Sequence, residues 1–347
     1  MAISSYELHG ERPLYAYYGS SMFIILTLGL LGNSLTLIIL FHPHHRKKRM
    51  TSMMVNLCAA DLLVCLLGYT VAVSYNTADF ANTGEAPALC FWLAIINCVT
   101  GLASIASLTT MAVLSYLGIA RNEFSQQNRM SRKLEALLIS GTWIYAIMLT
   151  IPPAFGWNRF IPIPSRISCH PDWYSSKLSD QAYIIYLTLF GFFIPLVVII
   201  FSFTGIYRYI KNTSVPQGMA DESAQERQRR SIRKTLKIVI AMTLAFFISW
   251  FPYAFSSLVG SALGHESISP AYSMIPELMA KASVVYNPII YVLLNAKFRL
   301  TLLNMLSCSW NRVGDNSTDD SDLDNGSTSG GQEMFRNAVG MGHAREA

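Results

Sequence analysis

The sequence predicts an all-α membrane protein built as a bundle of seven membrane-spanning helices. Of its 347 residues, 52% are hydrophobic and only 14% are charged, which suits a polytopic membrane protein better than a soluble domain. A spanning helix needs about 20 largely apolar residues. Polar or turn-rich connections separate seven stretches that satisfy this requirement: 18–40, 52–74, 88–120, 134–154, 181–209, 235–263 and 271–294.

The basic residues predict the orientation of the bundle. Lys and Arg gather in the first, third and fifth connections, whereas the N-terminal segment and the even-numbered connections carry few. Cytoplasmic loops of membrane proteins carry such an excess, so we expect segment 1–17 outside the cell and the C-terminus inside. The net charge of +5 requires no nucleic-acid partner, because membrane lipid with anionic headgroups can neutralise these loops.

Three of the first four predicted spans contain polar residues that lipid alone does not favour. The first holds Asn33, the second the carboxylate of Asp61, and the fourth Trp143. Buried polar groups of this kind must pair with one another inside the bundle.

The last three predicted spans contain prolines beside polar or aromatic residues. Proline kinks a spanning helix and frees carbonyls that neighbouring helices or waters must satisfy. Together with Asn33 and Asp61, these residues predict an internal polar network that can rearrange. They are Pro195 in the fifth span, Trp250-Phe251-Pro252-Tyr253 in the sixth, and Asn287-Pro288-Ile289-Ile290-Tyr291 in the seventh.

Lys281 is the residue of greatest functional interest, because it lies near the middle of the seventh span. A cation at that depth costs at least about 2.5–3.5 kcal/mol on insertion scales. An amine in such a site can lose its proton and condense with an aldehyde to give a Schiff base. The alternative is a structural lysine paired with Glu277, the one carboxylate of this span.

The cysteines and the C-terminal segment supply three further features. Cys90 and Cys169 both fall on the predicted extracellular side, where the compartment permits a disulfide, and their bridge would hold the second extracellular loop over the bundle. Cys308, on the predicted cytoplasmic side, is a candidate for palmitoylation or a plain thiol. We expect residues 309–347, which are rich in Ser, Thr and Asp, to form a disordered cytoplasmic tail.

These landmarks carry a resemblance to a known family. Over roughly residues 15–308 the chain resembles the class A (rhodopsin-like) G-protein-coupled receptors, and the Cys90–Cys169 pair matches the disulfide of that family. Segment 295–299 resembles the start of the family's amphipathic eighth helix, which places 295–308 on the inner leaflet. The positions that match the family's reference residues are Asn33, Asp61, Trp143, Pro195, Pro252 and Pro288.

Within that family the chain resembles the opsins. Lys281 stands six residues before Asn287, as does the lysine to which opsins attach retinal, and segment 156–162 resembles the loop that covers the retinal. The resemblance implies a light-sensing receptor in the plasma membrane or a photoreceptor membrane, not an enzyme. It implies 11-cis-retinal as covalent cofactor and a heterotrimeric G protein as partner.

The resemblance also implies which residues surround the retinal. They form an apolar, aromatic slot with few polar groups, as a polyene requires. The expected slot residues are Gly101, Leu102, Leu187, Phe192, Phe246, Trp250 and Tyr253, with Ser168 and His170 in the loop above them.

The carboxylates that opsins use as counterion are missing. The three positions where opsins place one read Ala72, Leu93 and Ile163. A buried Schiff base keeps its proton only beside a negative charge, and without one the pigment would absorb in the ultraviolet. This loss resembles a group of cnidarian (anthozoan) opsins.

Glu277 stands four residues before Lys281, which places the β-carbons of a helix about 5–6 Å apart. In a first mechanism Glu277 is the ionised counterion. In a second, which we favour, Glu277 is neutral in the dark and a chloride ion held near Asn97 and Ser168 supplies the charge. A third reading leaves Glu277 to satisfy backbone or loop groups only.

The cytoplasmic end departs from the family pattern. Where the family carries Asp/Glu-Arg-Tyr, this chain reads Leu114-Ser115-Tyr116, and the acid that often pairs with that arginine reads Ile232. A different restraint must therefore hold the dark state. The departure supports an alternative function, a retinal photoisomerase with little or no G-protein coupling.

Three features favour signalling over isomerisation. The switch residues Asn287, Pro288 and Tyr291 are intact, and the third cytoplasmic loop is basic and long. The tail carries Ser and Thr among Asp residues between 317 and 329, a pattern that resembles the targets of receptor kinases and arrestin. The retinal isomer bound in the dark separates the two functions: 11-cis for a sensor and all-trans for an isomerase.

Overall fold

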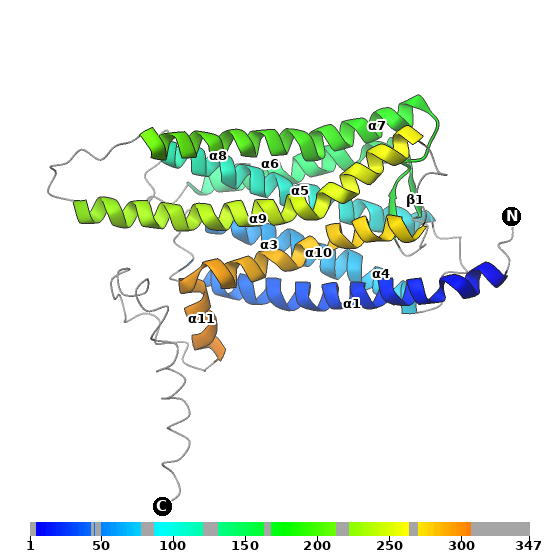
Figure 1. The fold of residues 1–347 in the computed structure, drawn as a ribbon, viewed down its shortest axis with the longest axis horizontal. Helices are drawn as coiled ribbons and strands as arrows, with labels where there is room; N and C mark the ends of the chain where they lie inside the picture. Colours follow the sequence, from blue (N-terminus) through cyan, green and yellow to red (C-terminus); the bar gives the residue numbers. More distant parts are fainter. Residues whose placement is uncertain are drawn as a thin grey trace, which may run out of the picture.

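The computed structural model describes residues 5–42, 45, 50–77, 87–120, 131–162, 168–212, 222–263 and 270–306. Within these ranges, seven helices are long and apolar enough to cross a membrane, as the sequence predicts: Ala16–Phe41, Thr51–Ser74, Ala88–Ile119, Arg132–Thr150, Leu178–Asn212, Leu236–Leu263 and Met274–Leu294. They run roughly side by side in one elongated bundle (Figure 1).

The helices that build the bundle have the following bounds. They are α1 (Ser5–Phe41), α3 (Thr51–Val64), α4 (Thr70–Thr77), α5 (Pro87–Ala120), α6 (Arg132–Thr150), α7 (Leu178–Thr188), α8 (Ile194–Asn212), α9 (Glu222–Leu263) and α10 (Pro270–Leu294). Two π-helical turns join pairs of these helices into single spans: η1 (Cys65–Tyr69) between α3 and α4, and η4 (Leu189–Phe193) between α7 and α8. The short helix α11 (Ala296–Leu306) turns away from the end of α10 (Figure 1).

One predicted boundary is wrong. The fourth span was expected to extend to residue 154, but α6 ends at Thr150, and a 3-10 turn, η3 (Pro152–Phe155), follows it. Proline lacks the N–H that a helix needs, and its ring clashes with the carbonyl four residues earlier. The pair Pro152-Pro153 therefore ends the helix early, and Gly156 completes the turn at a positive φ of 86°.

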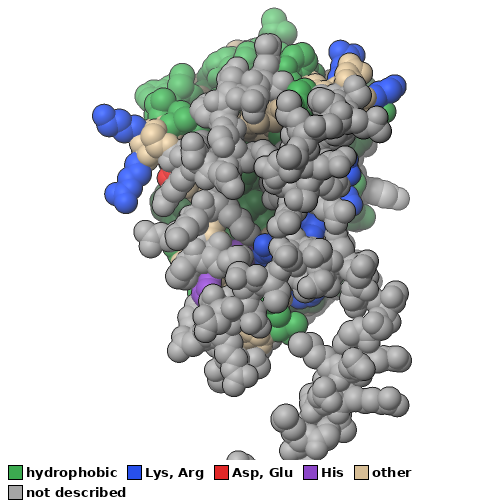
Figure 2. All heavy atoms as spheres, turned by 90° about the vertical axis from the view of Figure 1, so that its left-hand side faces the viewer, with side chains coloured by type: hydrophobic (Ala, Val, Ile, Leu, Met, Phe, Trp, Pro, Cys, Tyr) green, Lys and Arg blue, Asp and Glu red, His purple; other side chains and the backbone are tan. Residues whose placement is uncertain are grey.

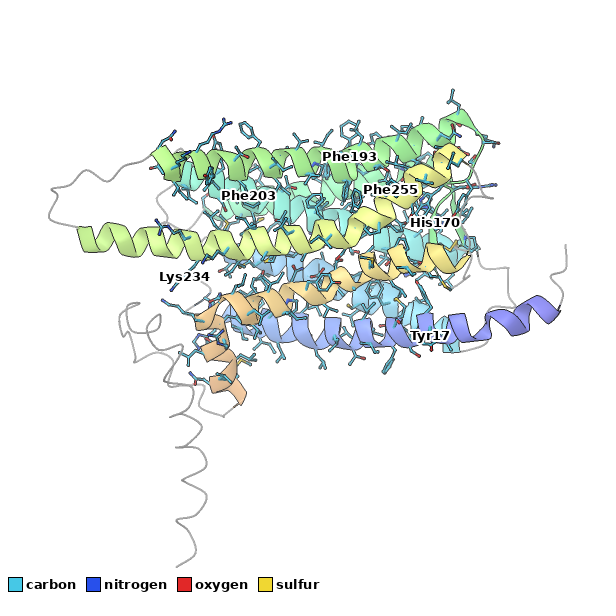
Figure 3. The ribbon with its side chains drawn as sticks, viewed as in Figure 1. Tyr17, His170, Phe193, Phe203, Lys234 and Phe255 are labelled. Atoms are coloured by element: carbon cyan, nitrogen blue, oxygen red, sulfur yellow. A yellow bond between two sulfur atoms is a disulfide. The ribbon has the colours of Figure 1, made fainter. Side chains whose placement is uncertain are left out.

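The bundle exposes apolar side chains on its outer surface and buries a limited set of polar side chains within a largely apolar core. Large side chains such as Phe193 and Phe255 are 40% and 58% exposed and lie on the outer surface (Figure 3), where lipid would contact them. Buried polar side chains instead tie the helices together. The amide of Asn56 on α3 donates to Ser107 on α5 (2.8 Å) and to Thr142 on α6 (3.1 Å), and accepts from the indole of Trp143 (2.9 Å).

The two ends of the bundle differ in chemistry. At one end, which we call the lid end, a two-stranded antiparallel sheet of β1 (Phe160–Pro162) and β2 (Cys169–Pro171) pairs Ile161 with His170. A disulfide joins Cys90 at the start of α5 to Cys169 in β2, as predicted. The opposite end, the basic end, presents Lys and Arg side chains around its rim (Figure 2), among them Lys234, labelled in Figure 3.

Candidate functional site

The amine of Lys281 lies inside the bundle and is paired with a carboxylate. Lys281 is 6% exposed, and its Nζ lies 3.3 Å from Oε1 of Glu277, one turn earlier on α10. Nζ also lies 3.3 Å from Ser168 Oγ and 3.5 Å from Asn97 Oδ1. Because a buried charge is tolerated only when it is paired and hydrogen-bonded, these contacts explain how the lysine persists there.

The aromatic ring of Tyr69 gives the lysine a further contact. Nζ lies 5.2 Å from the centre of this ring, within the range of a cation–π interaction. The Tyr69 hydroxyl donates to the backbone carbonyl of Lys281 (3.3 Å). Tyr69 is in the π-helical turn η1, where Thr70 Oγ1 donates to the carbonyl of Cys65, five residues earlier (2.8 Å). Such single π-turns occur frequently at functional sites.

A cavity lies among the helices around Lys281, and most of the expected slot residues line it. Its floor is aromatic: Phe246 stacks on Trp250 with ring centres 5.5 Å apart, and Tyr253 meets Trp250 edge to face at 5.7 Å. The Trp250 indole donates to Ser283 Oγ (3.2 Å). The predicted residues that line the cavity are Asn97, Gly101, Leu102, Ser168, Leu187, Phe192, Phe246, Trp250, Tyr253, Glu277 and Lys281.

Two glycines allow this cavity to exist. A Cβ at Gly101 would lie 2.8 Å from the Trp250 ring, and a Cβ at Gly191 would lie 2.7 Å from Leu102. Gly191 belongs to the second π-turn, η4. The hydroxyl of Tyr145 on α6 donates to the carbonyl of Phe190 in that turn. This hydrogen bond gives a partner to a carbonyl in the irregular part of the helix. Both π-turns therefore border the cavity.

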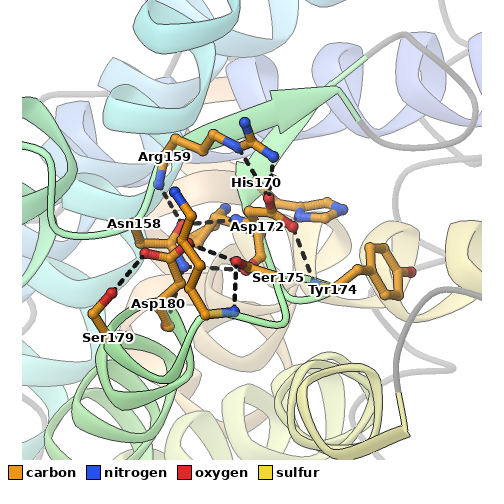
Figure 4. Close-up of polar contacts among 10 residues, drawn as sticks. Asn158, Arg159, His170, Asp172, Tyr174, Ser175, Ser179 and Asp180 are labelled. Carbon is orange, nitrogen blue, oxygen red and sulfur yellow. Dashed lines mark hydrogen bonds and ion pairs between the residues drawn. The ribbon is translucent and has the colours of Figure 1, made fainter.

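The lid is held by its own polar network (Figure 4). The guanidinium of Arg159 binds Asp172 with Nε and Nη2 each 3.0 Å from Oδ2. The Asn158 amide donates to the carbonyls of Asp172 and Asp180, both at 3.1 Å. Asn158 has a φ of 71°, a conformation that asparagine tolerates better than most residues. This segment closes the outer end of the cavity.

His170 does not line the cavity, contrary to the expectation for it. Its ring is buried and stacks on Trp173 with centres 4.0 Å apart, and Trp173 lines the cavity instead. Burial lowers the pKa of His170 from its usual value of 6.5, so the ring is neutral at pH 7. Its Nδ1 lies 2.6 Å from the carbonyl oxygen of Pro171, which assigns the hydrogen to that nitrogen.

The neutral positions near the lysine are also buried. Leu93 is 4% exposed and Ala72 is 3% exposed, whereas Ile163 lies outside the described residues. Neither described position offers a charge, so Glu277 is the carboxylate that contacts Lys281. The second oxygen of Glu277, Oε2, is buried and makes no hydrogen bond to any described residue.

The predicted switch residues form a buried network below the cavity. The Asn287 amide donates to Asp61 Oδ2 (2.9 Å), and the Asn33 amide donates to the carbonyl of Val284 (2.9 Å). Tyr291 is 1% exposed and stacks on Phe298 of α11 with ring centres 5.6 Å apart. Pro288 packs against Gly32, where a Cβ would lie 2.9 Å from the proline ring. Asp61 also lines the cavity, which thus reaches from the lid to this network.

At the basic end, apolar packing occupies the place of the missing ion pair. Ser115 is buried and donates to the carbonyl of Met111 (2.7 Å). The ring of Tyr116 lies against Gly205 of α8, where a Cβ would come within 2.4 Å of it. Buried Ile119, Ile206 and Leu236 join α5, α8 and α9 beside Tyr116. The side chain of Ile232 and residue Cys308 lie outside the described parts.

Comparison with known proteins identifies the fold and the family. Residues 32–291 match the family of "7 transmembrane receptor (rhodopsin family)". The chain belongs to the rhodopsin family of seven-transmembrane receptors. Membership of this receptor family also confirms the prediction that the chain is not an enzyme.

Several opsins are similar to this opsin-like receptor. Pinopsin of Columba livia is 30% identical over 302 residues, which cover 86% of this chain and 82% of pinopsin. The blue-sensitive opsin of Gallus gallus is 31% identical over 310 residues (88% and 83%), and melanopsin of Mus musculus is 32% identical over 313 residues (86% and 58%). The crystal structure of squid rhodopsin superposes with a TM-score of 0.76 at 23% identity, covering 86% of this chain and 83% of the other, which shows the shared fold.

Sequence reasoning missed several residues of the receptor's site. Tyr69, Trp173 and Ser283 all contact or border the lysine cavity. Tyr69 reaches Lys281 only because a π-turn rotates its part of the span, and no local pattern marks that turn. Trp173 lies in the lid. The resemblance to opsins pointed to its neighbour His170 and not to Trp173 as a residue near the retinal.

Proposed function

We propose that this receptor senses light through 11-cis-retinal held as a protonated Schiff base on Lys281. The observation that carries the proposal is the buried amine of Lys281, paired with a carboxylate, at the edge of an aromatic cavity. A lysine in that setting has no evident structural use, because a hydrophobic residue would fill the same space at lower cost. The similarity to pinopsin and melanopsin supports the same function.

The residues present fit the group. The cavity offers apolar and aromatic walls from Leu187, Phe192 and Trp250, which suit a conjugated hydrocarbon chain. Its polar atoms gather at one end, around Lys281 and Ser168. Lys281 would hold the retinal, whose isomerisation by light supplies the change of shape. Trp250, in contact with Gly101 and hydrogen-bonded to Ser283, would be displaced by that change.

The negative partner of the Schiff base has two candidate sources. Glu277 is the partner that contacts the free lysine, at 3.3 Å. A bound chloride is the second candidate, with Ser168 Oγ and Lys281 Nζ as its donors. Asn97 suits the role of chloride donor less well than the sequence indicated. Its amide nitrogen donates to the carbonyl of Leu93 (2.7 Å), and its amide oxygen is the atom that lies toward Lys281.

The absorption spectrum in the dark distinguishes these sources. The purified protein is combined with 11-cis-retinal, and its spectrum is recorded in chloride and again after exchange to gluconate. A visible band that moves to the ultraviolet without chloride assigns the charge to the anion. A visible band that is unchanged by the exchange and is lost in Glu277→Gln assigns the negative charge to Glu277. If no band forms at all, the proposed function is wrong.

Signalling to a heterotrimeric G protein is the output that the buried network supports. The contacts of Asn287 with Asp61 and of Tyr291 with Phe298 couple the cavity to the basic end, where such a partner would bind. Regulation by a receptor kinase and arrestin is proposed for the tail, which lies outside the described residues. A retinal photoisomerase would instead bind all-trans-retinal in the dark. Preferential formation of pigment with the all-trans isomer would therefore contradict the sensor function.

A further inference from the structure

Tyr18 brings a phenol from α1 into a buried cluster beside the lysine site, where the other α1 members of the cluster are apolar. It lies near the lid end of α1 and is 1% exposed, whereas its neighbour Tyr17 is 75% exposed and lies at the outer surface of α1 (Figure 3). Tyr18 packs in one buried cluster with Tyr69 and with Met274 of α10. Met274 is one helical turn before Glu277, so α1 meets α10 at the level of that carboxylate.

Two buried polar atoms at this level have no hydrogen bond to any described residue. They are the hydroxyl oxygen of Tyr18 and Oε2 of Glu277. The Tyr18 hydroxyl faces both Glu277 and Ser168. A phenol is a good donor and a carboxylate oxygen accepts only, so the two are chemically complementary. Buried polar groups rarely stay unpaired in proteins, and one water can join two such groups when they stand slightly too far apart.

We propose that Tyr18 is a positioning residue that donates a hydrogen bond to Oε2 of Glu277, directly or through a single water. The inference deepens the proposed function and rests on it for its photochemical meaning. With Oε1 on Lys281 and Oε2 held from α1, the carboxylate is fixed at both ends and cannot rotate away from the amine. A hydrogen bond to the charged form of a carboxylate also favours that form.

Two other ionisable groups near Glu277 already donate their hydrogens to backbone carbonyls. The Tyr69 hydroxyl donates to the Lys281 carbonyl, and His170 Nδ1 donates to Pro171. Among Tyr18, Tyr69 and His170, Tyr18 is the one whose hydroxyl has no hydrogen-bond partner among the described residues. Within the described part of the chain, the ionisable groups that interact electrostatically with Glu277 are Tyr18 from α1, Tyr69 from η1, His170 from β2, Tyr253 from α9 and Lys281 from α10 itself.

A double-mutant cycle on the retinal-free protein tests the pairing. The variants are Tyr18→Phe, which removes only the hydroxyl, Glu277→Met, which removes the acceptor at similar volume, and the double variant. Residues in contact give non-additive effects in such a cycle. We expect Tyr18→Phe to lower the thermal unfolding midpoint in the wild-type background and to lower it less beside Glu277→Met. Equal losses in both backgrounds, or no loss in either, would overturn the proposal.

Two further measurements keep the test decisive. Tyr17→Phe removes a hydroxyl next door on the exposed face, and it should leave the unfolding midpoint unchanged. If Glu277→Met does not fold, Tyr18→Phe alone is combined with 11-cis-retinal. Its absorption maximum should then shift from that of the wild type, because the field of Glu277 at the Schiff base changes, while Tyr17→Phe should not shift it. An unshifted Tyr18→Phe spectrum contradicts the proposal, whereas a wild type that forms no pigment contradicts only the proposed function.

Discussion

Individual residues set the shape and charge of the lysine cavity. Gly101 is the sharpest example, because a methyl group there would lie 2.8 Å from the Trp250 ring. We expect Gly101→Ala to displace the indole, to lower the yield of pigment with 11-cis-retinal and to shift its absorption maximum. Gly141→Ala is the matched control, since a Cβ at Gly141 meets nothing within 4 Å. Identical spectra for both variants would show that Trp250 does not border the bound retinal.

The buried pair of Lys281 and Glu277 makes a prediction that needs no retinal. Removing one member leaves an uncompensated buried charge, which typically costs about 3–5 kcal/mol. Glu277→Gln alone should therefore destabilise the retinal-free protein, whereas the double variant Glu277→Gln/Lys281→Gln should recover most of the loss. Thermal unfolding in detergent measures both. A double variant as unstable as the single one would mean that the ion pair does not couple these side chains.

The site could be predicted from the sequence where its contacts are local. The spacing of four residues between Glu277 and Lys281 fixes their contact on one helix, and the structure places Nζ and Oε1 3.3 Å apart. Tyr18 and Tyr69 reach the same point from α1 and η1, and no spacing along the chain reports contacts between helices. The sequence likewise does not report that His170 stacks on Trp173, because that contact depends on how the lid folds back.

At the scale of elements, apolar packing between α5, α8 and α9 is the restraint that the basic end offers in place of an ion pair. Gly205→Ala would displace the Tyr116 ring, because that ring fills the space that a Cβ at position 205 would need. We expect the variant to loosen this packing and to move α9 outward in the dark. A spin label at exposed Lys234 on α9, paired with one on α6, would report a longer distance than in the wild type. An unchanged distance would mean that Tyr116 does not restrain α9.

The lid makes a prediction about pH through His170. Burial lowers the pKa of His170 below the value of about 6.5 that it has in an unfolded chain. The unfolded state therefore binds the proton first, so stability falls as the pH drops below 6.5 and is complete above it. We expect His170→Phe, which can still stack on Trp173, to remove this part of the decline in the unfolding midpoint between pH 7 and 5. Parallel pH profiles for wild type and variant would contradict this assignment.

Elements were predictable to the extent that hydropathy defines them. The seven spans follow from long apolar runs, and the structure contains all seven. The early end of α6 required weighing Pro152-Pro153 against hydropathy, which continues past it. The π-turns η1 and η4 have no signature in the apolar pattern, because they fit the backbone to packing and to side-chain donors such as Thr70 and Tyr145.

At the scale of the whole molecule, one cavity joins the lid to the switch network. It is lined at one end by Ser168 and at the other by Asp61, which accepts from Asn287. The cavity therefore adjoins the Asn287–Asp61 hydrogen bond, and the ring stack of Tyr291 on Phe298 lies farther along the same helix, toward the basic end. At the basic end, Tyr116 packs against Gly205 beside buried Ile119, Ile206 and Leu236.

A covalent test shows directly whether Lys281 is the residue that binds retinal. The pigment formed with 11-cis-retinal is treated with borohydride, which reduces the C=N bond to a stable amine, and the protein is digested and mapped by mass spectrometry. We expect a retinyl group on the peptide that contains Lys281 and on no other lysine. A retinyl group on a different lysine, or none on a protein that is otherwise folded, would contradict it.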